Sequence, residues 1–153
     1  MEHNENFMIE SGDFAYKVND SEAEKASNSY LMSLVAIIAG LPLPIINLIA
    51  TFIFYLANQR STPFVRWHCT QALFSQLSLV IINSIGFWWT FTILFEERVI
   101  NNDYVAYMIV LFIFNLLEFI ATIYTAIQTR KGIHVKWWFY GDLSNSIVKH
   151  QSI

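Results

Sequence analysis

Residues 72–95 read ALFSQLSLVIINSIGFWWTFTILF and contain no charged side chain. About 20 apolar residues are needed to cross the ~30 Å hydrocarbon core of a bilayer as a helix. This run is long enough and is apolar all round, whereas a surface helix of a soluble protein carries one apolar stripe. It therefore predicts a transmembrane helix. The alternative is a helix buried in the core of a soluble protein.

Two further apolar stretches flank this run. Residues 30–57 carry no charge, and residues 104–129 carry only Glu118. Of the 153 residues, 55% are hydrophobic and 14% are charged, whereas soluble domains average roughly 25% charged. We therefore expect an all-α polytopic membrane bundle with three or four transmembrane helices, at about 30–57, 72–95 and 104–129.

Gly40, Pro42 and Pro44 interrupt the first stretch near its middle. Each proline removes a backbone donor and crowds the preceding turn, so we expect a kink there. In lipid the freed carbonyl groups must find partners in neighbouring helices. Alternatively, the stretch splits into two short halves that enter and leave on the same side of the membrane.

Thr62 followed by Pro63 is typical of a helix start, with the threonine hydroxyl as cap and the proline in the first turn. A helix over residues 63–95 would be about 50 Å long, which exceeds the hydrocarbon thickness. Its first turns, residues 63–71, are therefore predicted to form an interfacial amphipathic helix. Three- and four-residue spacing places the following side chains on one face of it: Phe64, Trp67, His68 and Gln71.

The chain is expected to divide into three parts. Residues 1–29 hold seven acids and two lysines and are expected to form a flexible acidic tail, with or without a short helix over residues 21–26. Residues 30–143 form the bundle, and residues 144–153 form a polar tail. With three spans, Lys and Arg are more numerous on the side of the carboxyl tail, by six to three. Because cytoplasmic loops carry the excess of Lys and Arg, the carboxyl tail is expected in the cytoplasm and the acidic tail outside.

Several classes of function have no support in the sequence. The net charge of −3 removes the broad attraction that nucleic-acid binding needs. Cys69 is the only cysteine, and the motifs for metal binding, phosphate binding and nucleophilic catalysis are absent. We therefore expect no catalytic, metal-binding or cofactor-binding residues, and a protein that is not an enzyme.

Each apolar stretch carries polar side chains at a similar depth: Asn47 in the first, Asn83 in the second, and Asn115 with Glu118 in the third. An ionisable residue inside a span is costly and is by default a candidate functional site. These four residues are interpreted either as a hydrogen-bonded cluster that holds the helices together, or as the polar path of a small ion, proton or solute transporter.

The segment TPFVRWHCTQAL, residues 62–73, resembles a signature of the Tic-twenty-like family of small bacterial membrane proteins. Lys131 and Gly132, followed by an aromatic run, resemble the family's carboxyl-terminal region. The resemblance covers about residues 29–143 and implies a relative of the membrane subunit of the chloroplast inner-envelope import machinery.

This resemblance implies a non-enzymatic subunit or scaffold of a membrane complex, associated with protein translocation or membrane-protein assembly in the cytoplasmic membrane. Expected partners are the lipid bilayer, translocase or insertase components, or further copies of the chain. The candidate residues for contact with the membrane interface or with partners are Pro63, Phe64, Arg66, Trp67, His68, Gln71, Trp137, Trp138 and Tyr140.

Overall fold

A computed structural model describes residues 14, 16–35, 44–96 and 99–150. Its helices, in chain order, are α1 (Asp20–Met32), α3 (Pro44–Asn58), α4 (Pro63–Phe95), α5 (Asn102–Arg130) and α6 (Tyr140–His150). No strand occurs in these ranges. The all-α prediction is confirmed.

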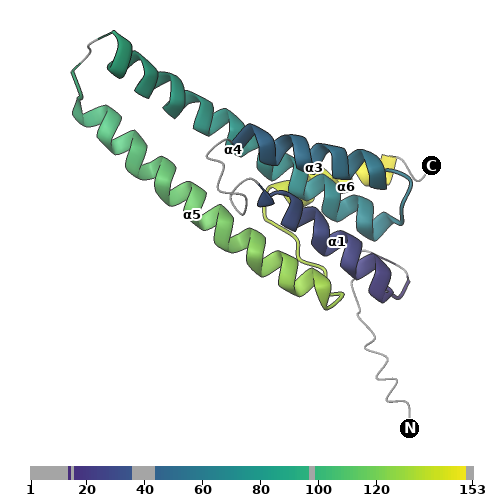
Figure 1. The fold of residues 1–153 in the computed structure, drawn as a ribbon. Coiled ribbons are helices and arrows are strands. Elements are labelled where there is room, and N and C mark those ends of the chain that lie inside the picture. The colour runs from purple at the N-terminus through teal and green to yellow at the C-terminus, as the bar shows by residue number, and fades with distance from the viewer. Residues whose placement is uncertain (1–13, 15, 36–43, 97–98, 151–153) are drawn as a thin grey trace.

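The two longest helices, α4 and α5, run antiparallel and are joined at one end of the molecule (Figure 1). At the other end α1 lies between them and contacts both, α3 packs along α4, and α6 packs on α4. We call α1, residues 63–79 of α4 and residues 122–148 the head. Residues 80–95 and 102–121 form a projecting hairpin that we call the arm.

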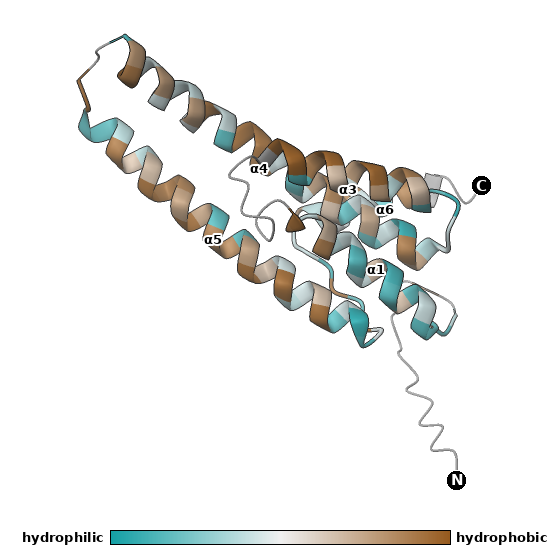
Figure 2. Ribbon diagram, viewed as in Figure 1, coloured by the Kyte–Doolittle hydropathy of each residue, from teal (hydrophilic) through white to brown (hydrophobic). Residues whose placement is uncertain are grey.

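Both α4 and α5 are long and apolar enough to cross a membrane. Only 11% and 6% of their most apolar windows are buried, whereas a core helix of a soluble protein is mostly buried. Brown apolar residues cover the arm in Figure 2, whereas α1 is largely hydrophilic. The exposure of so much apolar surface indicates a membrane protein and disfavours the soluble alternative.

The predicted count of three or four transmembrane helices is wrong for the described residues, where two helices qualify. The predicted span at 30–57 begins inside α1, a hydrophilic helix that ends at Met32. The second part of that stretch is α3, whose 15 residues extend about 22 Å. That length is short of the ~30 Å hydrocarbon core. The predicted kink is not tested, since Gly40 and Pro42 lie outside the described residues, as does the side chain of Pro44.

The amino-terminal segment does not lie opposite the carboxyl-terminal one, as the three-span topology requires. Helix α1 begins at Asp20, within the predicted acidic tail, and Glu24 Oε2 pairs with Arg130 Nη1 at 2.8 Å. The start of α1 therefore lies beside the end of α5. In the predicted polar tail, residues 144–150 belong to α6.

Local chemistry explains where the helices begin and end. Asn19 and Glu22 form a capping box at the start of α1, with bonds of 2.9 and 3.0 Å to each other's backbone amides. Helix α4 begins at Pro63 as the sequence predicts, but the Thr62 hydroxyl makes no capping hydrogen bond. After α5, Gly132 has a φ of 77°, a left-handed conformation that glycine adopts at little cost.

Gly86 is buried on α4 and faces α5. A Cβ at this position would come within 2.6 Å of Leu111 Cδ1 and 3.4 Å of Tyr107 Cε1. One turn away, the Tyr107 hydroxyl donates to the Ile82 carbonyl at 2.8 Å. The glycine therefore lets α4 and α5 pack at short distance, as small residues do between membrane helices.

Replacing Gly86 with leucine should separate the arm helices. The added side chain must displace Leu111, and overpacking of this kind costs about 1–3 kcal/mol, so thermal unfolding in mild detergent should occur at a lower temperature. The matched control is Ser84→Leu, because Ser84 is exposed on α4 and should tolerate the same side chain. Equal melting temperatures for the two variants would contradict the close packing at Gly86.

Candidate functional site

Hydrogen-bonded side chains fill the interior of the head where α1, α4 and residues 133–137 meet. The Tyr30 hydroxyl lies 2.8 Å from His68 Nδ1, and Gln71 Nε2 donates to that hydroxyl at 2.7 Å. On the other side of its ring, His68 Nε2 lies 3.1 Å from His134 Nδ1. Tyr30, His68 and Gln71 are each 0% exposed. We call these four residues the head network.

One arrangement of protons satisfies every contact in the head network. Gln71 donates to Tyr30, the tyrosine hydroxyl donates to His68 Nδ1, and His68 Nε2–H then donates to His134. Burial raises the pKa of the Tyr30 hydroxyl well above its ordinary value, which keeps it neutral and able to donate. The network therefore needs no charged side chain.

Gln71 extends the network to the loop after α5. Its Nε2 also donates to the Val135 carbonyl at 3.1 Å, and its Oε1 accepts from the Trp137 amide at 2.9 Å. The Trp137 indole in turn donates to Thr125 Oγ1 at 2.7 Å and stacks on Tyr30. A single glutamine thus joins α1, α4 and the loop, and Trp137 adds α5.

Aromatic rings surround the network. The Phe64 ring lies 4.6 Å from His68, and the Trp67 ring lies 4.3 Å from His134, measured between centroids. Trp67 Nε1 also donates to Asn145 Oδ1 on α6 at 2.6 Å. These contacts exclude water from the hydrogen bonds, which strengthens them.

Most of the residues predicted to contact partners therefore face inward. Phe64, Trp67, His68 and Gln71 are at most 1% exposed, and Trp137 is turned toward Thr125. Because the face predicted to lie at the interface is covered by α1, the loop and α6, these side chains hold the head together. The remaining predicted contacts are Pro63 and Trp138, which are exposed, and Arg66 and Tyr140, which are half-buried.

The predicted intramembrane cluster is only partly assembled. Asn83 and Asn115 exchange two side-chain hydrogen bonds of 3.1 Å across the arm. Glu118 lies separately, at the boundary of arm and head, where its Oε1 accepts from three side chains. Asn47 is buried on α3. The donors to Glu118 are Ser75 at 2.5 Å, Thr122 at 3.0 Å and Gln76 at 3.1 Å.

Sequence reasoning missed Tyr30 and His134 as members of a site. Tyr30 is the first residue of the predicted span 30–57, but it belongs to α1, whose five other buried residues are small or polar. His134 lies 66 residues from His68 and shares no spacing with it. The serines and alanines near Tyr30 in the sequence could have indicated a closely packed helix, because small side chains permit close helix packing.

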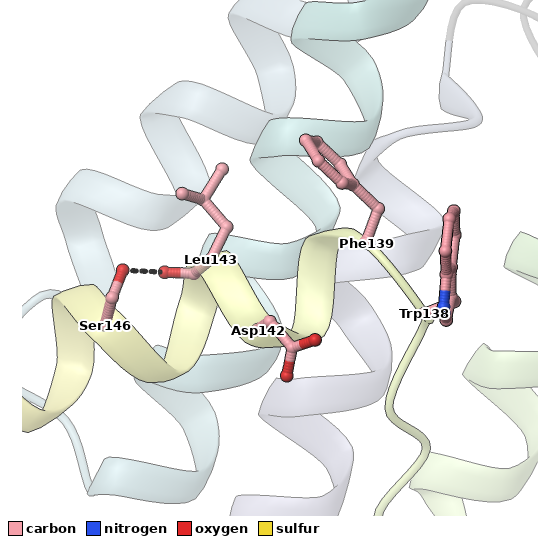
Figure 3. A pocket seen from close by; sticks show the side chains of 5 residues that line it. All are labelled: Trp138, Phe139, Asp142, Leu143 and Ser146. Atoms are coloured by element: carbon pink, nitrogen blue, oxygen red, sulfur yellow. Dashed lines mark hydrogen bonds between the residues drawn. The ribbon is translucent and has the colours of Figure 1, made fainter.

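A pocket of about 420 Å³ lies on the outside of the head, at the start of α6. Its lining residues are Trp138, Phe139, Asp142, Leu143 and Ser146 (Figure 3). In the described part of the chain, no group of three or more His, Cys, Asp or Glu side chains could hold a metal ion.

Replacing Gln71 with leucine should destabilise the head. The variant leaves the Tyr30 hydroxyl, the Val135 carbonyl and the Trp137 amide without this partner, and buried unpaired groups cost about 1–3 kcal/mol each. Thermal unfolding in mild detergent should therefore shift clearly downward. In Gln128→Leu, which removes an exposed bond of 3.2 Å to Tyr124, the shift should be small. A small shift for both variants would show that the network contributes little.

Comparison with known proteins identifies a family. A family model described as the magnetosome magnetite crystal formation protein family (MamF/MmsF) matches residues 26–143. This range contains α3, α4, α5 and all four residues of the head network. No curated protein and no solved structure matches the chain.

The match corrects the predicted resemblance to the Tic-twenty-like family. That resemblance rested mainly on residues 62–73, whereas the magnetosome family model extends over more than half of the chain. Within this segment, His68 and Gln71 are interior residues of the head. The expected role in protein translocation, with translocase or insertase partners, loses its basis.

Proposed function

The chain belongs to the magnetosome magnetite crystal formation protein family, and we propose that it is a non-enzymatic integral membrane protein that takes part in forming magnetite crystals at the magnetosome membrane. The family match over residues 26–143 carries this proposal. The exposed apolar surface of α4 and α5 supports it, because these helices require a bilayer around them.

The structure favours a role for the arm as the membrane anchor and a role for the head in contacting other components of the membrane. Polar groups of the arm bond to one another, as Asn83 does with Asn115 and Thr90 Oγ1 does with the Tyr104 hydroxyl at 2.9 Å. The outer surface of the arm is left apolar. The head carries the loops and shorter helices, which are the parts able to meet other components of the crystal-forming membrane, including further copies of the chain.

We further propose that the head faces the cytoplasm. The structure places Arg60, Arg66, Arg130, Lys131 and Lys136 at the head end of the two long helices, whereas Arg98 lies in the sequence that connects them at the other end. Cytoplasmic segments carry the excess of Lys and Arg. With two crossing helices, the amino-terminal segment from Asp20 shares that side with the carboxyl-terminal segment.

Transport through the polar cluster is a weaker alternative. A path for ions or solutes would need polar groups that stay open to a passing ligand. Asn83 and Asn115 instead satisfy each other, and Glu118 accepts hydrogen bonds from three side chains of the same chain. These contacts favour the helix-packing role of the cluster.

The proposal is tested by expressing the tagged chain in a magnetite-forming bacterium that lacks its own member of the family. We expect the protein to co-purify with magnetically isolated magnetosomes, to resist carbonate extraction, and to change the crystal-size distribution seen by electron microscopy. Unchanged crystals together with absence from magnetosomes would overturn the proposal.

Charged substitutions test in the same assay whether the apolar surface of the arm anchors the chain in the membrane. Ile113→Arg with Ile120→Arg places two charges on the exposed apolar face of α5, at about 2.5–3.5 kcal/mol each near a membrane centre. This variant should leave the membrane fraction. The matched control introduces two arginines at exposed polar positions outside the arm, Gln59→Arg with Ser146→Arg, and should remain in the membrane.

A further inference from the structure

The pocket at the start of α6 combines an apolar wall with a pair of opposite charges. Trp138 is 91% exposed and Phe139 is 62% exposed, which is unusual for large aromatic side chains on a protein surface. In Figure 3, Phe139 and Leu143 point to the same side of the segment, Trp138 stands at its end, and Asp142 lies below them. Lys136 Nζ pairs with Asp142 Oδ1 at 2.5 Å beside this wall.

Gly141 positions this ion pair. A Cβ at residue 141 would overlap Lys136 Cγ and would lie 3.1–3.2 Å from the next atoms of that side chain. The stem of Lys136 therefore crosses directly over the first turn of α6 to reach Asp142. The side chains of Lys136 and Asp142 are 39% and 72% exposed, so both charges remain accessible from outside.

The pocket lies at the level where the apolar run of α4 begins. Trp137, the residue before Trp138, is bonded to Gln71 on α4 and to Thr125 on α5. The uncharged run of α4 starts at residue 72, directly after Gln71. Exposed apolar residues also continue along α5 through Tyr124 and Ile127 to this level. The pocket is thus level with the end of the lipid-facing surface, at the depth where tryptophan is favoured in membranes.

We propose that this pocket binds a phospholipid of the surrounding bilayer, with a zwitterionic headgroup that carries a primary ammonium, such as phosphatidylethanolamine. Lys136 donates to the phosphate, and Asp142 accepts from the ammonium, which also lies near the indole face of Trp138. Phe139 and Leu143 contact the upper part of an acyl chain. A volume of about 420 Å³ accommodates a headgroup and the first methylenes but not a whole lipid.

The charge pattern selects this lipid class. An anionic headgroup without an ammonium would satisfy Lys136 and leave Asp142 facing a like charge. A choline headgroup cannot donate a hydrogen bond to Asp142. The adjacent opposite charges of Lys136 and Asp142 match a zwitterion with donors at its positive end. The site should therefore bind phosphatidylethanolamine in preference to both phosphatidylglycerol and phosphatidylcholine.

The first test measures lipid retention by native mass spectrometry of the full chain, after exchange into a mixture of equal parts of these three phospholipids. We expect a one-to-one complex with phosphatidylethanolamine, reduced about fivefold in Lys136→Met with Asp142→Asn, as for loss of a surface charge pair. Gly141→Leu should reduce it similarly while keeping both charges. Asp103→Asn, at the other end of α5 and exposed, is the matched control and should retain the lipid.

The second test uses the fluorescence of Trp138 in vesicles, taken as the difference between the native chain and Trp138→Phe. Lipids brominated near the headgroup should quench this fluorescence, and aqueous iodide should not. Quenching by iodide alone, or equal retention of all three lipids by native and variant chains, would overturn the proposal. Neither readout depends on crystal formation, so the lipid site and the proposed function can fail independently.

Discussion

The amide of Gln71 is placed between the Tyr30 hydroxyl, the Val135 carbonyl and the Trp137 backbone amide, and the architecture of the head depends on these bonds. Helix α1 is hydrophilic overall, although its Tyr30 packs with Ala72 of α4 and Ala126 of α5. Hydrogen bonds from Tyr30 and from Ser27, whose hydroxyl donates to the Ala126 carbonyl at 2.7 Å, also attach it. Such bonds are effective because water is excluded around them.

The arm follows a different physical rule. Its helices share few residues in contact, and their outer surfaces are apolar. In a bilayer, lipid replaces the hydrophobic core that a soluble hairpin would need, so the helices associate through packing at Gly86 and through paired polar groups such as Asn83 and Asn115. The same two helices, α4 and α5, thus contribute both to the membrane anchor and to the polar head. The boundary between these two parts lies near Glu118.

The helical class and the two long apolar helices could be predicted because they depend on residue runs that are read locally. The predicted span at residues 30–57 was wrong at its start. Residues 30–35 are as apolar as a transmembrane span, but partners about 40 and 100 residues away hold Tyr30 in the head. The face containing His68 and Gln71 was recognised from helical spacing. This face of α4 is covered by α1 and by the loop after α5. The spacing of residues within one helix carries no information on segments so distant in the sequence.

The central claim to test is that residues 63–71 form the sealed interior of the head and not an exposed interfacial helix. Cys69, the only cysteine, reports on this directly, since it is 1% exposed beside His68. In native membranes, a membrane-impermeant maleimide should label Cys69 far more slowly than it labels an introduced Gln59→Cys in a Cys69→Ser background. Labelling of Cys69 should accelerate in Tyr30→Phe, which opens the network. Labelling of native Cys69 at the rate of the control, or protection unchanged in Tyr30→Phe, would contradict a sealed interior held by the head network.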